Sequence, residues 1–413
     1  MSRLNELIQQ YCPDGVEYKK LGELGVFYGG LSGKTKEDFK DGNAKFISYK
    51  NVFYNLSLNI DTDERVKIEE GEKQNTIQYG DILFTGSSET PDECGMSSVL
   101  TQRTDEKLYL NSFCFGYRLH NLSQFSPDFL KHLFRSNELR KQIGKTASGT
   151  TRFNVSKKRF AEVSIPVPPL PVQEEIVRIL DNFAELQAEL QAELQKRLQQ
   201  YNYYRDNLLS FEGRTDVEWK KLGDVADLLS GFPFDSTQFT SAGIRLMRGV
   251  NIKRGQLCFN ENDDRYWKST AGLEKYIVEE NDIVISMDGS LVGKSFGMVK
   301  KEHLPLLLVQ RVARIRSSVF NINFIYHCIK NWFPNYVDKK KTKGAIPHIS
   351  MKDIANLPLP SLSLEEQEKI ATILDRFDTL TNDLSQGLPA EIEARRKQYE
   401  YYRDQLLTFK QKA

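Results

Sequence analysis

The sequence predicts an α+β protein in which two pseudo-two-fold-related globular domains, β-rich with helices, are joined by two long helices packed as an antiparallel coiled-coil-like spacer. Three observations predict this architecture: an internal duplication, β-rich runs early in each copy, and helical periodicity late in each copy. The predicted domains are residues 1–165, which include a short N-terminal helix, and 213–357. The predicted spacer helices are 166–212 and 358–413.

The duplication has a period of about 200 residues, too long for a solenoid unit and suited to a whole domain with its following helix. VEYKKLGEL at 16–24 returns as VEWKKLGDV at 217–225, with six of nine residues identical. YNYYRDNLLSF at 201–211 returns as YEYYRDQLLTF at 399–409, with eight of eleven identical. The first dozen residues resemble the end of such a helix, which predicts that the two chain ends lie close together.

Each domain alternates short β-rich runs with Gly, Asn and Asp, the pattern of strands and turns. Helical patches follow at 126–143 and 321–333, and proline-rich stops at 165–171 and 357–360 then end each domain.

Apolar residues in both spacers recur at a 3-4 spacing, which predicts a coiled-coil-like seam. The alternative is a core helix lying on its own domain. The length of 173–211 argues against it, because such a helix spans about 58 Å. Gly387-Leu388-Pro389 predicts a kink or brief break in the second spacer. The seam residues are Ile176, Ile179, Phe183, Leu186 and Leu190, then Ile370, Ile373, Phe377, Leu380 and Leu384.

Composition excludes several classes of protein. The 57 Lys and Arg against 56 Asp and Glu leave a net charge of +1, so overall charge indicates no partner. No apolar run approaches the roughly 20 residues of a membrane span, and the start lacks a signal-peptide core. The five cysteines form no CxxC motif, which argues against a zinc ribbon or disulfide framework and predicts a reducing cytoplasm.

Basic residues gather at the same place in both copies: residues 129–160 hold nine basic and one acidic, and 291–345 hold eleven and two. Lys and Arg beside Ser, Thr and Gly suit phosphate oxygens. A solvated charged face is the alternative, but two equivalent runs favour nucleic acid. The predicted phosphate contacts are Lys141, Lys145, Thr146, Ser148, Thr150, Thr151, Arg152, Lys157, Lys158, Arg311, Arg314, Lys339, Lys340, Lys341 and Lys343.

Catalytic and metal-binding motifs are missing from the sequence. The histidines show no HExxH spacing, and there is no GxSxG elbow or methyltransferase NPPY-like tetrad. GGLSGKT at 29–35 has Tyr28 where a P-loop requires its first glycine. We therefore predict no catalytic residue, no metal site and no cofactor in this chain.

Tyrosine-rich helix ends predict a protein-docking surface, since aromatic rings and Arg are enriched at interface hot spots. Core packing between the helices is the alternative for each ring. The candidates are Tyr201, Tyr204, Arg205, Tyr399, Tyr402 and Arg403.

Over its full length the chain resembles the specificity subunits of type I restriction–modification systems. The resemblance rests on the duplication, the PVPPLPVQEEI entry at 166–176, the ILDxF cores at 179–183 and 373–377, and both YxYYRDxLL blocks. It implies a non-catalytic subunit whose two target-recognition domains each read half of a split, asymmetric double-stranded DNA sequence.

The resemblance also implies partners. The helices would dock two modification subunits that bind S-adenosylmethionine, and restriction subunits with ATP and magnesium would complete the assembly. Two alternatives stay open: a specificity subunit of a related system with a fused nuclease–methyltransferase, and a scaffold that joins two proteins without touching DNA.

Base-reading residues are sought in loops after strands, among side chains with donors and acceptors for the major groove. A turn-stabilising role is the alternative for each. The candidates are Ser48, Lys50, Asn51, Thr85, Ser87 and Ser88 in the first domain, and Arg248, Asn251, Ser286, Asp288, Ser290 and Lys294 in the second.

The first spacer contains a tandem tetrapeptide, QAELQAEL at 187–194, made of strong helix formers. Four residues add about 6 Å and about 40° beyond one helical turn, and one DNA base pair adds about 3.4 Å and roughly 35°. The rotation nearly matches one base pair, whereas the translation lies between one and two. We base the prediction on the rotation, because a domain facing the wrong side of the duplex cannot reach its groove. A third QAEL unit is expected to lengthen the unread gap by one base pair, as measured by mapping methylated bases. An unchanged gap with full activity would contradict this.

Overall fold

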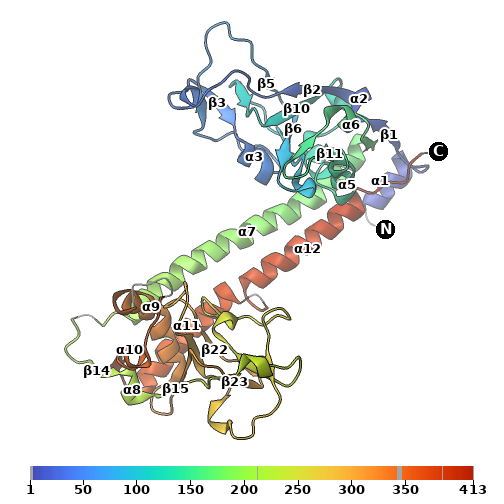
Figure 1. The fold of residues 1–413 in the computed structure, drawn as a ribbon. Coiled ribbons are helices and arrows are strands. Elements are labelled where there is room, and N and C mark those ends of the chain that lie inside the picture. Colours follow the sequence, from blue (N-terminus) through green and yellow to red (C-terminus); the bar gives the residue numbers. More distant parts are fainter. Residues whose placement is uncertain (1–2, 212, 342–346, 384, 413) are drawn as a thin grey trace. The chain divides into compact units, whose positions relative to one another are not determined.

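The computed structural model describes residues 3–211, 213–341, 347–383 and 385–412. The chain divides into two compact units: unit 1 is Met1–Ala192 with Glu391–Ala413, and unit 2 is Glu193–Ala390. Each unit thus combines one domain with the start of its own spacer and the end of the other spacer (Figure 1). The unit boundaries cut through spacer helices, whereas the boundaries that the sequence predicts follow the change of secondary structure.

Unit 1 is built from short strands with helices packed beside them. Its helices are α1 (Arg3–Tyr11), α2 (Leu21–Leu24), α3 (Tyr49–Tyr54), α4 (Pro127–Leu133), α5 (Asn137–Gly144), α6 (Lys157–Phe160) and the first part of α7 (Leu170–Leu208), with 3₁₀ turns η1 (Glu37–Phe39), η2 (Pro91–Glu93) and η3 (Leu122–Gln124). Its strands are β1 (Glu17–Lys20), β2 (Gly25–Gly29), β3 (Ala44–Ile47), β4 (Arg65–Val66), β5 (Thr76–Ile77), β6 (Ile82–Thr85), β7 (Ser87–Ser88), β8 (Ser97–Val99), β9 (Leu108–Leu110), β10 (Cys114–Leu119), β11 (Ala147–Ser148), β12 (Phe153–Val155) and β13 (Ser164–Val167).

Unit 2 has a similar but not identical order of elements. Its helices are the end of α7, α8 (Leu222–Val225), α9 (Ile322–Lys340), α10 (Met351–Ala355), α11 (Leu364–Asn382) and the start of α12 (Leu388–Leu406), with η4 (Ser236–Gln238), η5 (Gly249–Asn251), η6 (Glu274–Tyr276) and η7 (Lys301–His303). Its strands are β14 (Glu218–Lys221), β15 (Asp227–Ser230), β16 (Ile244–Met247), β17 (Ile252–Lys253), β18 (Gln256–Leu257), β19 (Tyr266–Trp267), β20 (Ile277–Val278), β21 (Ile283–Ser286), β22 (Phe296–Met298), β23 (Leu306–Leu308), β24 (Val312–Arg316) and β25 (Pro358–Ser361).

Three sheets of unit 1 have counterparts of the same topology in unit 2. The order β2-β10-β6-β8 matches β15-β24-β21-β22, and β4-β3-β9-β5 matches β19-β16-β23-β20. The pair β1-β13 matches β14-β25. Only β3 with β9 and β16 with β23 pair in parallel among the ladders between described strands. The predicted α+β class and the predicted duplication are both confirmed.

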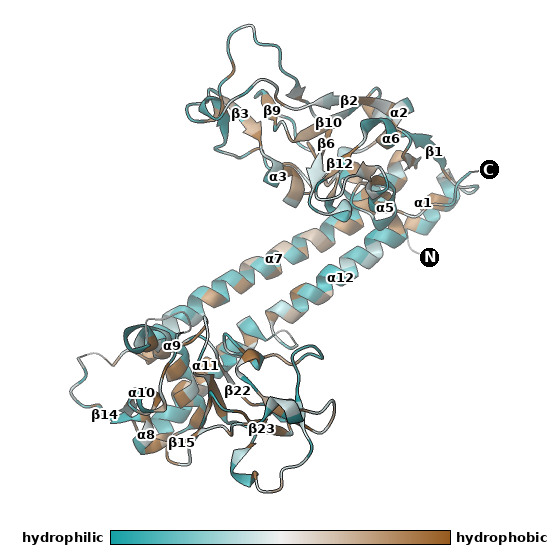
Figure 2. Cartoon of the chain, viewed as in Figure 1, coloured by the Kyte–Doolittle hydropathy of each residue, from teal (hydrophilic) through white to brown (hydrophobic). Residues whose placement is uncertain are grey.

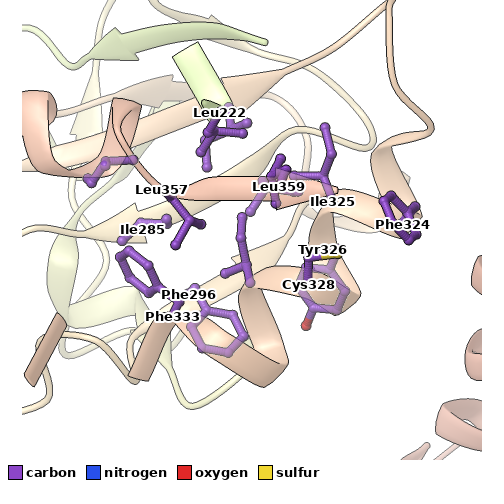
Figure 3. Close-up of a cluster of buried hydrophobic side chains, with 14 of the residues drawn as sticks. Leu222, Ile285, Phe296, Phe324, Ile325, Tyr326, Cys328, Phe333, Leu357 and Leu359 are labelled. Carbon is purple, nitrogen blue, oxygen red and sulfur yellow. The ribbon is translucent and has the colours of Figure 1, made fainter. Parts of the chain in front are cut away.

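The largest hydrophobic core lies in unit 2, between the β15-β24-β21-β22 sheet and helix α9 (Figure 3). Ile285 and Phe296 from the sheet meet Phe324 and Phe333 from the helix, all buried. The equivalent core of unit 1 packs Phe84 and Phe115 against α4 and α6. In both units the helical patch that the sequence predicts covers one face of this sheet. The central strands are buried on the other face too, where Leu83 and Val284 belong to separate cores.

The end of a spacer helix completes each core. Tyr201 and Leu209, near the end of α7, are buried in the core of unit 2. Tyr399 and Leu407, near the end of α12, occupy the corresponding places in unit 1. The backbone amide of Val16 also donates to the carbonyl of Lys410 at 2.9 Å, which confirms that the two chain ends meet.

The first spacer is one continuous helix of 39 residues, α7, and the QAEL repeat lies inside it. Hydrophilic and hydrophobic residues alternate along it (Figure 2). Ile176 is the buried residue of the predicted seam in this helix, and the other four are partly exposed. Leu180, about one turn after Ile176, is buried in place of the predicted Ile179. The second spacer breaks after Asn382 and resumes at Leu388, which confirms the break predicted at Gly387-Leu388-Pro389.

Each spacer helix is fixed to its own unit by the same two side chains. The buried amides of Gln173 and Gln367 bond backbone groups of the preceding loops, including Ser126 N–H at 2.9 Å and Asn321 N–H at 2.9 Å. Eight residues further on, about two helical turns, Asp181 and Asp375 each accept from a buried histidine.

These histidines come from the domain helices α4 and α9. His132 Nε2 lies 2.7 Å from Asp181 Oδ1, and its Nδ1 lies 2.9 Å from the Tyr399 hydroxyl at the end of α12. His327 Nε2 lies 2.7 Å from Asp375 Oδ1. His132 therefore ties a domain helix to the start of one spacer and to the end of the other.

The His132 contacts predict a specific loss of stability in unit 1. Burial lowers the pKa of His132, so the neutral ring donates from Nε2 to Asp181 and accepts from Tyr399. His132→Ala leaves the Tyr399 hydroxyl unpaired, and we expect a loss of about 1–3 kcal/mol at pH 8. Calorimetric unfolding of the full chain measures it.

The same loss should depend on pH. A folded-state pKa below the usual value of about 6.5 means that the unfolded chain binds the proton first. His132 therefore stabilises the fold above about pH 6.5, and this stabilisation is lost as the pH falls further. The difference in free energy of unfolding between the wild type and His132→Ala should be smaller at pH 5 than at pH 8. His120→Ala, at an exposed histidine of the same unit, is the control. If His132→Ala lowered the free energy of unfolding equally at both pH values, the assignment of a neutral His132 ring would be contradicted.

Candidate nucleic-acid interface

Unit 1 carries an open hollow, which we call the aromatic basin, where α3, β7 and the segment between β11 and β12 meet. Its volume is about 650 Å³. The lining brings together predicted base readers, predicted phosphate contacts and four aromatic rings that the sequence analysis missed. The lining residues are Tyr49, Lys50, Phe53, Tyr54, Ser87, Ser88, Glu89, Glu93, Phe113, Thr151 and Arg152.

A capped helix sets one wall of the basin. Ser48 Oγ accepts from the Asn51 amide at 3.4 Å at the start of α3. The Asn51 side chain donates to the Asn59 carbonyl at 2.7 Å, which holds the helix against the loop that follows it. With the helix fixed, Tyr49 and Phe53 stack at 6.0 Å along the basin wall. Ser48 and Asn51, both predicted base readers, thus serve the helix.

Polar contacts organise the floor. The Tyr49 hydroxyl donates to the Ser87 carbonyl at 2.8 Å, and burial raises the pKa of Tyr49, so it remains a donor. Arg152 Nε lies 3.2 Å from Ser87 Oγ, and its guanidinium lies 5.6 Å from the centre of the Phe113 ring. The Ser88 hydroxyl donates to Glu93 at 3.1 Å. The floor is therefore ordered before any ligand arrives.

Two rings at the basin are left largely exposed: Tyr54 at 75% and Phe113 at 58%. Exposed aromatic side chains around a concave surface mark binding sites more often than isolated exposed rings do. Periodicity could not have identified them, because Tyr54 is the last residue of α3 and Phe113 lies in the turn just before β10.

Strand register locates the equivalent surface in unit 2. Lys45 pairs with Leu108 in unit 1 as Arg245 pairs with Leu306 in unit 2. The same offset in the sequence aligns Phe53 and Tyr54 with Lys253 and Arg254. The local structure differs, because Phe53 and Tyr54 end helix α3, whereas Lys253 ends strand β17 and Arg254 follows it.

A second register aligns the third ring. The Gly86 amide donates to the Phe113 carbonyl at 2.8 Å, and the Met287 amide donates to the Arg311 carbonyl at 2.9 Å. Phe113 and Arg311 are therefore equivalent. At these three aligned positions unit 1 has aromatic residues and unit 2 has basic ones. The strands around Phe113 and Arg311 match, whereas η5 and β17 take the place of α3 in unit 2.

Arg311 is held in an unusual conformation. Its φ of 69° is in the left-handed region, which is uncommon for non-glycine residues and concentrates at functional sites. Its side chain is 62% exposed, with Nη1 3.4 Å from Asp288 Oδ2. His348 also bonds Asp288. Together they form an exposed charged cluster that replaces the rings of unit 1.

Most predicted phosphate contacts are exposed, but two are not. Thr146 is buried and donates to the Ile143 carbonyl at 2.7 Å. Arg314 is buried and paired with Asp227. Both serve the fold, so the proposed contact set excludes them. Lys341 is partly exposed and lies 2.7 Å from Asp338, and Lys343 lies outside the described residues. The exposed members are Lys141, Lys145, Ser148, Thr150, Thr151, Arg152, Lys157, Lys158, Arg311, Lys339 and Lys340.

Four predicted base readers are buried in the fold: Thr85, Ser87, Asn251 and Ser286. Thr85 Oγ1 accepts from the Met96 amide at 2.9 Å, and Asn251 Nδ2 donates to the Cys258 carbonyl at 3.2 Å. These residues were predicted because their side chains can donate and accept hydrogen bonds. In the structure those donors and acceptors bond other groups of the protein.

Six other candidates keep accessible surface. Arg248 is partly exposed, with Nη1 donating to the Asp263 carbonyl at 2.9 Å. The remaining candidates with exposed or partly exposed surface are Lys50, Ser88, Asp288, Ser290 and Lys294.

The predicted docking residues divide in the same way. Tyr201, Tyr399 and Arg403 are buried in unit cores and are excluded from the docking surface. Tyr204 and Tyr402 are each 40% exposed and stack on the spacer rings Phe377 and Phe183, both at 5.4 Å. Arg205 is partly exposed and pairs with Asp206 at 2.8 Å. The more exposed neighbours Tyr203 and Tyr401, at 66% and 61%, were not among the candidates.

No group of three or more His, Cys, Asp or Glu side chains is placed to hold a metal ion in the described part of the chain. No helix in this part of the chain is long and apolar enough to cross a membrane.

Comparison with known families gives two matches along the chain. The model described as "Type I restriction modification DNA specificity domain" matches residues 13–200 and again 215–394. Each match covers one domain and most of the spacer that follows it.

Curated relatives carry related names. The specificity subunit of the type I restriction enzyme EcoR124I/EcoR124II of Escherichia coli is 36% identical over 281 residues, which cover 60% of this chain and 64% of that protein. The EcoAI specificity subunit of Escherichia coli is 32% identical over 224 residues, covering 53% of this chain and 38% of that protein. The chain thus spans less than two thirds of the length of these relatives.

Solved structures share the fold. The type I restriction-modification S subunit from M. genitalium has a TM-score of 0.58 at 15% identity, covering 95% of this chain and 96% of that one. A chain from a study of complex assembly and conformational transition in the type I R-M system has a TM-score of 0.59 at 18% identity, covering 95% and 97%.

Proposed function

Because two copies of the type I restriction modification DNA specificity domain account for most of its length, the chain belongs to that family, and we propose that it selects the DNA target for partner enzymes. It would bind a bipartite, asymmetric sequence, with one half read by each unit. One observation carries the asymmetry: Phe113 of unit 1 is replaced in register by Arg311 of unit 2, and the sequence offset aligns Phe53 and Tyr54 with Lys253 and Arg254. We expect surfaces that differ so much in chemistry to prefer different bases.

The exposed basic residues would supply the affinity that is independent of sequence. Lys and Arg contacts to phosphates position a protein on DNA, and contacts to bases specify the sequence. In unit 1 these cations, including Lys157 and Arg152, border the loop that lines the aromatic basin. Phosphate contacts would thus bring the basin to the base pairs.

The catalytic work would belong to partners. We propose that two modification subunits transfer methyl groups from S-adenosylmethionine, and that restriction subunits use ATP and magnesium to cleave. This chain would act in the cytoplasm without a cofactor of its own. The names of the relatives, which are specificity subunits, support this division of labour.

Exchange of one domain tests the proposal. Residues 16–165 are replaced by the corresponding segment of another family member, with His132 kept. Gln173 lies outside the exchanged segment, so both spacer contacts remain. Methylation mapping of the complex with its partner subunits should show one half of the target changed and the other half unchanged.

The reciprocal exchange of residues 217–357 is the control and should change the opposite half. If either exchange altered both halves, the units would not read DNA independently. If the wild-type complex methylated no defined sequence, target selection itself would be contradicted.

A further inference from the structure

We propose that the aromatic basin of unit 1 receives one nucleobase of the first half-site, unstacked from the duplex, and that unit 2 takes none. This inference rests on the proposed DNA-reading function and adds to it a ligand class and a site. It is carried by the shape of the basin, its rings and the balance of its charges.

The aromatic rings of the basin favour a planar ligand that can stack on them. Tyr49 and Phe53 form a stacked wall, while Tyr54 and Phe113 stand exposed at the basin. Bases within a duplex present only their edges to the grooves. Their faces become available when a base leaves the stack, and stacking on a protein ring then contributes about 1–3 kcal/mol per base.

The charged side chains of the lining suit a base better than a phosphate group. Lys50 and Arg152 are matched in the lining by Glu89 and Glu93, so the basin lacks the positive excess that a phosphate site requires. Carboxylates accept hydrogen bonds from the exocyclic amino groups of cytosine and adenine. The lining therefore suits a planar ligand with both donors and acceptors.

The hollow shape favours reception of a base over insertion of a wedge. A wedge side chain protrudes between base pairs and kinks the duplex. Here the exposed rings surround a volume of about 650 Å³, which lies within the range of about 300–1,000 Å³ found for small-ligand sites. Arg152, between Ser87 and Phe113, is placed to contact the backbone of the displaced nucleotide.

Unit 2 presents a different surface at the aligned positions. Its η5 and β17 take the place of α3 and its rings, and Arg311, in register with Phe113, is held beside Asp288. Base extrusion should therefore be confined to one half of the target, and this asymmetry makes the proposal testable.

The test uses the assembled complex and its mapped target. Each base of both half-sites in turn is placed opposite a mismatch, which lowers the cost of unpairing. Affinity should rise about tenfold at one position of the first half-site, since unpairing costs a few kcal/mol and about 1.4 kcal/mol corresponds to tenfold. Partner methyltransferases flip the base that they methylate, so the informative position is a different one.

Two variants identify the basin as the cause. Tyr54→Ala with Phe113→Ala should abolish the gain at this position and leave the gain at the methylated bases. Both side chains are mostly exposed, so the fold should be preserved. Tyr11→Ala, at a ring 46% exposed on α1, should leave every gain in place.

The outcomes separate the two proposals. A gain confined to the methylated bases, or one that persists in the double variant, would overturn the basin assignment while the DNA-reading function stands. A wild-type complex that does not prefer its mapped duplex would overturn both.

Discussion

Each half of this protein depends on a helix end supplied by the other spacer. Tyr399 and Leu407 complete the core of unit 1, and Tyr201 and Leu209 complete that of unit 2. Buried apolar side chains of this size contribute about 1.5–3 kcal/mol each, so neither unit is complete without its borrowed helix. The spacers are therefore part of both cores, and α7 passes from one unit into the other without a break.

The scaffold and the reading surface use separate residues. Scaffold side chains such as Gln173 and His132, with their counterparts in unit 2, are buried, and both units share the bond from a loop amide to Gln and the bond from His to Asp. The residues that differ in chemistry, such as Tyr54 and Arg254, are exposed. Exposed substitutions typically change stability by no more than about 0.5 kcal/mol. One fold can thus carry two unlike surfaces.

Sequence alone predicted the duplication, the α+β class and the spacer break, because identity, period and proline placement are visible in a single chain. It could not distinguish polar side chains that bond within the protein from those that are free to contact DNA. Thr85 and Asn251 have the donors and acceptors of a base reader, but both are buried. It also missed Tyr54 and Phe113, because no local pattern reports the exposure of a ring. The equivalence of Phe113 and Arg311 required strand register.

The central claim is that the aromatic basin of unit 1 binds DNA by stacking, in addition to the phosphate contacts of that unit, whereas the aligned surface of unit 2 binds by charge. The most direct test is the salt dependence of DNA affinity for two triple-alanine variants of the assembled complex, one at Phe53, Tyr54 and Phe113, the other at Lys253, Arg254 and Arg311. Each lost phosphate contact lowers the log–log slope by about 0.9. The second variant should lower it by up to about three, and the first should weaken binding with the slope unchanged. Equal slopes for the two variants would contradict the account.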